Sequence, residues 1–227
     1  MNVRLASAGA CELAVPTEGP ALPGLLAWPD HPSALVLFAH GSGSSRLSRR
    51  NAAVAGQLRA AGLATFLFDL LTPEEAERRA AVFEIGPMAE RLHLAAEWLT
   101  ARSEVAGLAV GYFGASTGAA AALCAAAIPG SRVGAVVSRG GRPDLAGDDL
   151  ERVAVPTLLI VGSRDEAVLE LNRRAYWRLN CTKRLLVVPG ATHLFEEPGT
   201  LEEVGEAAAG WFVEHLVLAP RWHGDRR

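Results

Sequence analysis

The chain has 227 residues, half of them hydrophobic, which is enough to bury one large core and fits a single domain, residues 1–227, better than two. The formal net charge of −3, with both signs interspersed, offers no broad basic surface to nucleic acid and no acidic tail. Three widely separated cysteines without C-x-x-C spacing argue against a zinc or redox motif and indicate reduced thiols in a cytoplasmic protein.

The two ends of the chain carry few structural signals. Residues 1–19 contain one arginine and no continuous apolar stretch, so we expect no secretion signal. Residues 218–227 are rich in arginine and are expected to form a flexible tail.

Short apolar segments alternate with amphipathic ones along the rest of the chain. The pattern predicts strands at 11–15, 24–28, 34–39, 63–68, 108–113, 133–138, 156–161 and 184–188, the first two as a hairpin. It predicts helices at 47–61, from Thr72-Pro73 toward Arg79, and at 87–102, 117–128, 167–176 and 201–216. This alternation predicts an α/β fold, with a mostly parallel sheet of about eight strands covered on both faces and chemistry at the strand carboxyl ends.

Residues 105–130 contain no charged side chain and include the sequence Gly-Ala-Ser-Thr-Gly around Ser116. A membrane span is the alternative, because glycine pairs in this stretch have the G-x-x-x-G spacing of helix packing. Four glycines would weaken such a helix, whereas a sharp strand-to-helix corner needs residues without bulk at 114 and 118. We therefore expect Ser116 at such a corner, with the positive end of the next helix behind its hydroxyl.

A serine hydroxyl at neutral pH needs a base that takes its proton and a carboxylate that orients the base. Asp165 and His193 follow the last two expected strands, so both lie beyond a strand carboxyl end, as Ser116 does. The chain order Ser, Asp, His is that of a catalytic triad in an α/β-hydrolase sheet. The alternatives are a helix-capping role for Asp165, Glu166 as the acid, and a solvated loop position for His193.

The oxyanion that forms when a serine attacks a carbonyl needs backbone donors. We expect an oxyanion hole made by the N–H groups of Ser42 and Thr117, with His40 ordering the loop rather than acting as base. An ordinary Gly/Ser loop at 40–45 is the alternative. The loop has neither the lysine of a P-loop nor a G-x-G-x-x-G fingerprint, so we expect no cofactor, and we assign no metal site.

Six segments carry a resemblance that extends over nearly the whole chain. They are HGSGSS at 40–45, FDLLTPEE at 68–75, GYFGASTGAA at 111–120, SRGGRPDLA at 138–146, VGSRDEAV at 161–168 and VVPGATHLFEEPG at 187–199. Together they resemble the α/β-hydrolase superfamily and, more narrowly, its dienelactone hydrolase-like serine hydrolases. Dienelactone hydrolases use a cysteine nucleophile where this sequence has Ser116, so we do not expect the dienelactone itself as substrate. Relatives with such segments sometimes also carry a phosphoribosyltransferase domain, which this sequence lacks.

The superfamily often inserts a helical lid after its sixth strand, and the stretch 139–155 is too short for one. We therefore expect an open cleft and a carboxylesterase-like enzyme that cleaves small or short-chain esters through an acyl-enzyme. One of five loop arginines could hold a substrate carboxylate, while most are expected to be solvated: Arg46, Arg49, Arg50, Arg139 and Arg142. Lactone or thioester hydrolysis, acyl transfer and a low-turnover ligand-binding protein on the same fold stay open as alternatives.

Overall fold

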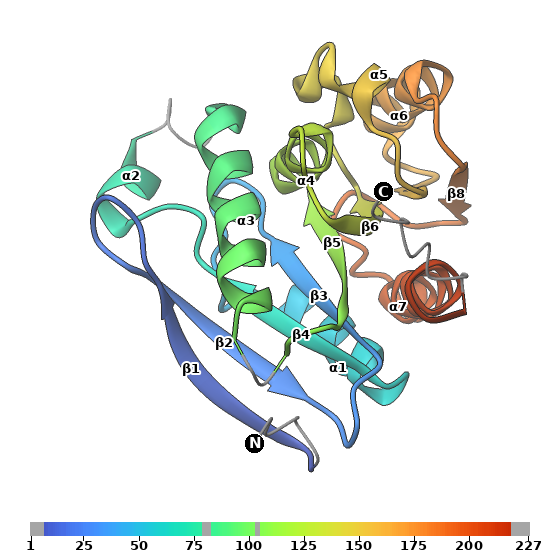
Figure 1. The fold of residues 1–227 in the computed structure, drawn as a ribbon. Helices are drawn as coiled ribbons and strands as arrows, with labels where there is room; N and C mark the ends of the chain where they lie inside the picture. Colours follow the sequence, from blue (N-terminus) through green and yellow to red (C-terminus); the bar gives the residue numbers. More distant parts are fainter. Residues whose placement is uncertain (1–6, 79–82, 103–104, 219–227) are drawn as a thin grey trace, which may run out of the picture.

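An eight-stranded sheet forms the centre of the computed structural model, which describes residues 7–78, 83–102 and 105–218 (Figure 1). Its strands are β1 (Gly9–Val15), β2 (Leu22–Trp28), β3 (Ala34–Ala39), β4 (Leu63–Phe68), β5 (Ala109–Ala115), β6 (Val133–Arg139), β7 (Thr157–Gly162) and β8 (Lys183–Val188). They lie in the order β1-β2-β4-β3-β5-β6-β7-β8. The β1–β2 and β2–β4 pairs are antiparallel and all the others parallel, which confirms the predicted mostly parallel α/β fold.

Helices cover both faces of this sheet. They are α1 (Arg49–Ala60), α2 (Pro73–Glu77), α3 (Ile85–Thr100), α4 (Thr117–Ala127), α5 (Asp149–Arg152), α6 (Glu166–Arg178) and α7 (Thr200–Phe212). The apolar sides of α1 and α7 join one hydrophobic cluster, and those of α3, α4 and α6 join another on the opposite face. Alternate residues of β3 enter the two clusters, as the two-residue period of a strand requires.

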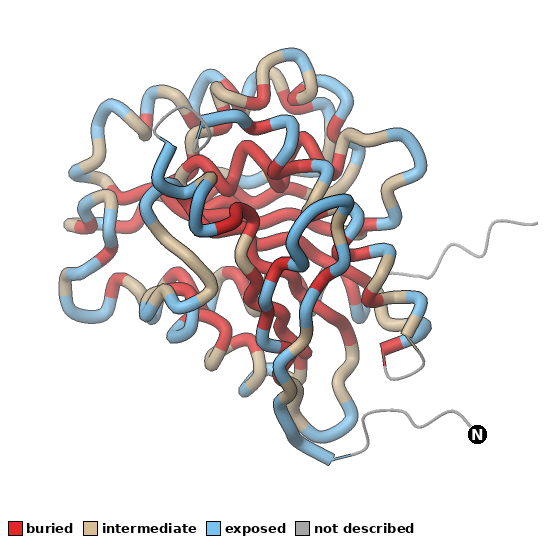
Figure 2. Tube along the Cα trace, turned by 90° about the vertical axis from the view of Figure 1, so that its left-hand side faces the viewer, coloured by how far each residue is buried: buried red, intermediate tan, exposed pale blue. Residues whose placement is uncertain are grey.

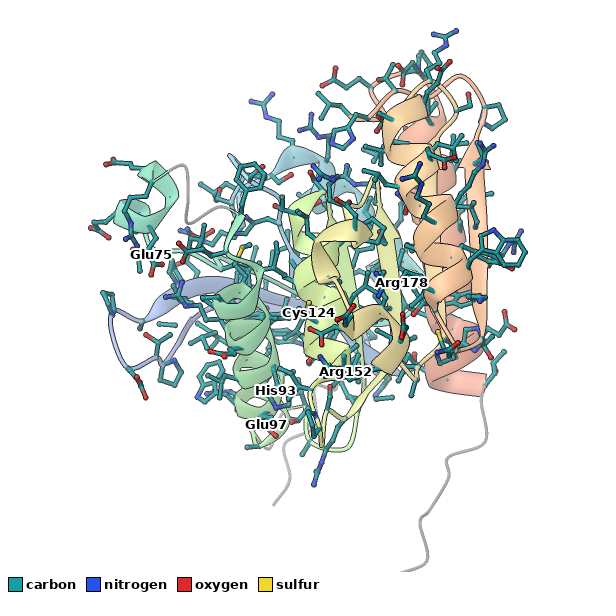
Figure 3. All side chains as sticks on the ribbon, turned by 90° about the horizontal axis from the view of Figure 1, so that it is seen from above. Glu75, His93, Glu97, Cys124, Arg152 and Arg178 are labelled. Carbon is teal, nitrogen blue, oxygen red and sulfur yellow. The ribbon has the colours of Figure 1, made fainter. Side chains whose placement is uncertain are left out.

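The core follows the central strands and α4 (Figure 2). Every residue of β3 and β4 is buried, and so is every residue of α4 from Thr117 to Ala126. A helix made largely of alanine suits this place because it has no polar face and lets α3 approach closely. Cys124, halfway along α4, contacts the carbonyl oxygen of Ala146 with its Sγ at 4.0 Å (Figure 3).

The apolar stretch at 108–128 is therefore a buried strand followed by a buried helix. Within the described ranges, no helix combines the length and the apolar character that a membrane crossing needs.

Two regions differ from the predicted elements. The segment 139–155, for which no helix was predicted, contains a 3₁₀ turn at Pro143–Ala146 and the single-turn helix α5. The last predicted helix is α-helical only to Phe212 and continues as a π-helical segment, Val213–Leu218. Most of the expected tail, from residue 219 on, lies outside the described residues, as does Arg79.

Candidate active site

Ser116 lies at the sharp turn between β5 and α4. Its backbone has φ 51° and ψ −121°, a conformation that residues with a side chain seldom adopt. A Cβ at Gly114 would lie 2.4 Å from Cα of Ala119, and one at Gly118 would lie 2.2 Å from the carbonyl oxygen of Ala39. No side chain fits at either position, which confirms the predicted corner and its requirement for small residues.

Asp165 and His193 meet above the carboxyl ends of β7 and β8. The Nδ1 atom of His193 lies 2.6 Å from Oδ2 of Asp165, and the carboxylate is the more buried of the two groups. Asp165 precedes α6 but caps it with no side-chain hydrogen bond, so its carboxylate is available to the imidazole. Of the alternatives for this acid, it is Asp165, not Glu166, that contacts the histidine.

Ser116 and His193 line the same small cavity of about 210 Å³. Its other walls come from the loop after β3, the start of α1, the end of β6 and Leu194. Among the described contacts there is no hydrogen bond between Ser116 Oγ and the imidazole. Such bonds are often long in a substrate-free enzyme and shorten when substrate binds.

The two expected oxyanion donors lie side by side. The N–H of Ser42 donates to Oγ1 of Thr117 at 2.8 Å, across 75 positions of sequence. A Cβ at Gly41 would lie 2.9 Å from that of Ser116, so this loop packs directly against the corner. The structure brings Ser42 and Thr117 together, and the Ser42 N–H is occupied by the threonine hydroxyl.

His40 is buried and ties two loops together. Its Nε2 accepts a hydrogen bond from the N–H of Leu70 at 2.9 Å, and its Nδ1 lies 3.1 Å from the carbonyl oxygen of Gly41. Burial lowers the pKa of this imidazole, so the ring is neutral at physiological pH. This agrees with the predicted role in ordering the loop.

The five loop arginines have different environments. Arg46 pairs with Asp69, Arg142 with Asp144 and Arg50 with Glu196, and Arg49 is exposed. Arg139 is instead 8% exposed and lines the same cavity as Ser116.

The sequence named Arg139 only as one of five loop arginines, and it did not mark its neighbour Asn51 as a site residue. A signal for Arg139 was present, because it ends an apolar strand beside the corner and pairs in register with Ala115. No comparable signal marks Asn51, which is buried in the first turn of an otherwise ordinary surface helix.

No group of three or more His, Cys, Asp or Glu side chains in the described part of the chain is arranged to hold a metal ion. The candidate site therefore consists of the corner serine, the Asp165–His193 pair, the Ser42–Thr117 contact and a cavity with arginines in its wall.

Comparisons with known proteins agree with this architecture. The family model "Dienelactone hydrolase family" matches residues 22–215. The crystal structure of a dienelactone hydrolase from Anabaena variabilis is 50% identical, covers 92% of this chain and 99% of its own, and superposes with a TM-score of 0.89. Est1E from Butyrivibrio proteoclasticus, also solved with ferulic acid bound, is 18% identical over 89% of this chain and 98% of its own, with a TM-score of 0.75, and shows the fold alone.

A longer relative carries a different name. A Mycobacterium tuberculosis H37Rv protein named "Putative phosphoribosyl transferase" is 61% identical over 193 residues, which are 85% of this chain and 44% of that protein. The matched part of this chain thus covers less than half the length of these curated relatives. From the family match and the similarity along most of its length, the chain belongs to the dienelactone hydrolase family, with an α/β-hydrolase fold.

Proposed function

We propose that this protein is a serine hydrolase that cleaves carboxylic esters of small or short-chain substrates. Ser116 is the nucleophile, His193 the general base and Asp165 the residue that orients the base. The observation that carries the proposal is the 2.6 Å contact between Asp165 and His193 at the edge of the cavity that Ser116 also lines.

The proposed reaction begins when Ser116 Oγ attacks the ester carbonyl carbon and its proton passes to Nε2 of His193. Asp165 accepts the Nδ1–H bond and so stabilises the imidazolium that forms. The oxyanion is held by the N–H groups of Thr117 and Ser42, the latter turning from the Thr117 hydroxyl to the substrate oxygen. The intermediate then collapses, the alcohol leaves with the proton from His193, and water hydrolyses the acyl-enzyme by the same route.

Two further features support this proposal. The amino-terminal end of α4 lies at Ser116, where its free N–H groups and dipole favour developing negative charge. The cavity of about 210 Å³ fits a short acyl group, and the elements between β6 and β7 are single turns rather than a lid domain. The Mycobacterium tuberculosis relative is named a putative phosphoribosyl transferase, but this chain matches only 44% of that protein. The proposed activity is therefore based on the cavity and not on that name.

The test is labelling of the purified protein with a fluorophosphonate probe together with hydrolysis of p-nitrophenyl acetate. We expect Ser116→Ala to lose labelling and to reduce turnover by on the order of 10⁶. Ser33→Ala is the matched control, because the Ser33 hydroxyl donates a hydrogen bond to the carbonyl oxygen of Gly62, away from the cavity. Retained activity in Ser116→Ala would disprove the assignment.

The absence of a described hydrogen bond between Ser116 and His193 favours one second candidate, a ligand-binding protein with low turnover. Labelling of Ser116 without steady hydrolysis of any ester would support that candidate. Steady hydrolysis would exclude it, and a screen of lactones, thioesters and acyl-accepting alcohols would then separate the reactions that share an acyl-enzyme.

A further inference from the structure

The corner at Ser116 is held by a short segment, residues 139–142, at the end of β6. The N–H of Ser116 donates to the carbonyl oxygen of Arg139 at 3.2 Å, and the N–H of Arg142 donates to the carbonyl oxygen of Ser116 at 3.0 Å. The segment therefore bonds to both backbone polar groups of the proposed nucleophile. Whatever fixes this segment also fixes the corner.

The first of these two bonds has a backbone anchor. Arg139 and Gly140 share one planar peptide unit, so the carbonyl oxygen that accepts from Ser116 moves together with the N–H of Gly140. That N–H donates to the carbonyl oxygen of Ile160 in β7 at 2.8 Å. The first half of the segment is thus fixed by the sheet itself.

The second bond depends on a side chain. Gly141 and Arg142 also share one peptide unit, and its carbonyl oxygen accepts a hydrogen bond from Nδ2 of Asn172 at 2.9 Å. Asn172 lies on α6, is fully buried, and also donates to the carbonyl oxygen of Val168 at 2.8 Å. Among the described hydrogen bonds, Asn172 provides the only one that joins a side chain to the backbone of residues 139–142.

The surroundings of this bond are tightly packed. A Cβ at Gly141 would clash with Ser138 Oγ and would lie 2.6 Å from Cβ of Ala119, so the segment lies directly against α4. The Oδ1 atom of Asn172 is buried without a partner, which offsets part of the stability that its two donor bonds contribute. Leucine has the same branched shape and no such oxygen, but it lacks the donor that holds the carbonyl group of Gly141.

We propose that Asn172 is a positioning residue that directs the backbone N–H of Thr117 toward the oxyanion. The C=O of Ser116 and the N–H of Thr117 belong to one planar trans peptide unit and point in opposite directions. A Ser116 carbonyl held by Arg142 therefore fixes the direction of this donor. The N–H of Ala119 donates to the same carbonyl oxygen at 3.1 Å, so Asn172 contributes part of the restraint. This inference rests on the proposed function, because it assigns a residue that supports its oxyanion hole.

The first test is steady-state hydrolysis of p-nitrophenyl acetate by Asn172→Leu. The substitution removes both side-chain donor bonds. Because the oxyanion forms only as the reaction proceeds, we expect kcat to fall about 10-fold while KM stays within about 2-fold of the wild-type value. Loss of a whole oxyanion donor costs about 10²–10³ in kcat, and the smaller loss expected here reflects the remaining bond from Ala119.

An inhibitor that forms an oxyanion gives a second readout. When 1,1,1-trifluoro-2-butanone binds, its carbonyl carbon forms a bond with Ser116 Oγ, its carbonyl oxygen becomes the oxyanion, and the serine proton passes to His193. The inhibition constant should rise about 10-fold in Asn172→Leu, in step with the loss in kcat. A merely structural effect on the cavity would change KM and leave this agreement absent.

Two further variants complete the series, each checked for folding by circular dichroism. Asn172→Ser is smaller than the wild-type residue, and its hydroxyl bonds within its own helix, so it should lose kcat as Asn172→Leu does even if leucine prevents folding. Asn180→Leu is the matched control, because the amide of the exposed Asn180 also donates to a backbone carbonyl oxygen, that of Glu151, at 3.3 Å. It should keep the wild-type kcat, KM and inhibition constant.

Hydrogen exchange tests the restraint independently of turnover. We expect the Arg142 amide, followed by NMR, to exchange at least about 10-fold faster in Asn172→Leu or Asn172→Ser than in the wild type and in Asn180→Leu. Unchanged exchange, or a change in KM alone, in a folded variant at Asn172 would overturn the proposal.

The outcomes for the two proposals are distinct. Wild-type turnover that the folded variants at Asn172 retain in full would overturn the positioning role and leave the esterase proposal in place. Absence of labelling and turnover in the wild type would overturn the esterase proposal and, with it, the catalytic purpose of the restraint. In that case the exchange of the Arg142 amide still decides whether Asn172 holds the corner.

Discussion

Ser116 holds a backbone conformation that side-chain-bearing residues avoid, with φ 51° and ψ −121°. Such strain costs about 1–3 kcal/mol at a non-glycine residue, and the close contacts of the neighbouring glycines maintain it. Glycine adopts this conformation without strain. Its unfolded chain is more flexible, however, and this lowers the stability of the folded state by about 0.5–1 kcal/mol. We therefore predict that Ser116→Gly has a free energy of unfolding about 1 kcal/mol higher than that of Ser116→Ala.

Urea denaturation of the two variants is the measurement. Both lack the hydroxyl, so the comparison isolates the Cβ atom and its strain from any effect of the nucleophile. A Ser116→Gly variant that is less stable than Ser116→Ala would show that the corner is not strained in solution.

At the scale of elements, α2 is a five-residue helix that is too short to be stable alone. Glu75 holds it in two ways: it forms a capping box with Thr72, and it makes two bonds to Arg91 of α3, at 2.6 and 2.8 Å (Figure 3). The same guanidinium donates to the carbonyl oxygen of Leu70 at 2.7 Å, so it also anchors the segment that enters α2.

The hydrogen bonds from Arg91 are the main reason that the pKa of Glu75 falls to about 2, from 4.5 in the unfolded chain. The folded state therefore binds this proton less tightly, so the stabilisation is complete above pH 4.5 and is lost as the pH falls toward 2. Because both side chains are about one fifth exposed, we expect Glu75→Gln to lose about 1–2 kcal/mol of unfolding free energy at pH 7. The difference from wild type should shrink at pH 3.

Urea titrations at the two pH values test this prediction. Glu77→Gln is the control, because Glu77 is an exposed acid at the end of the same helix. If Glu75→Gln lost the same amount at pH 3 as at pH 7, the ion pair would not be the cause.

At the scale of the whole molecule, the features that the sequence predicted correctly are strands marked by an unbroken run of apolar residues and the side chains that directly follow such strands. The predicted strands at 34–39 and 63–68 match β3 and β4 residue for residue, because both are uninterrupted apolar runs buried on both faces. The contact between Asp165 and His193 was expected because parallel strands present their carboxyl ends at one edge.

The parts that were missed depend on tertiary contacts or on very short elements. The helix at Asp149–Arg152 is a single turn, too short for an apolar period. The burial of Arg139 comes from Asn51 and Phe195, which are distant in sequence, and the bond between Ser42 and Thr117 likewise joins two separate loops. Contacts between side chains so far apart in sequence leave no local pattern.

The assignment of residues 1–227 to one domain is itself a prediction about cooperativity. The two hydrophobic clusters lie on opposite faces but are built from alternate residues of the same strands, so neither face can lose its packing without exposing the sheet. Trp98 of α3 packs against one cluster, and Trp211 of α7 belongs to the other. We predict that two single-tryptophan variants, one that keeps Trp98 and one that keeps Trp211 with the other four tryptophans replaced by phenylalanine, show fluorescence transitions in urea that coincide with far-ultraviolet circular dichroism. Within each variant, a fluorescence midpoint that differs from the circular dichroism midpoint would mean that the faces unfold separately, and the single-domain assignment would then be wrong.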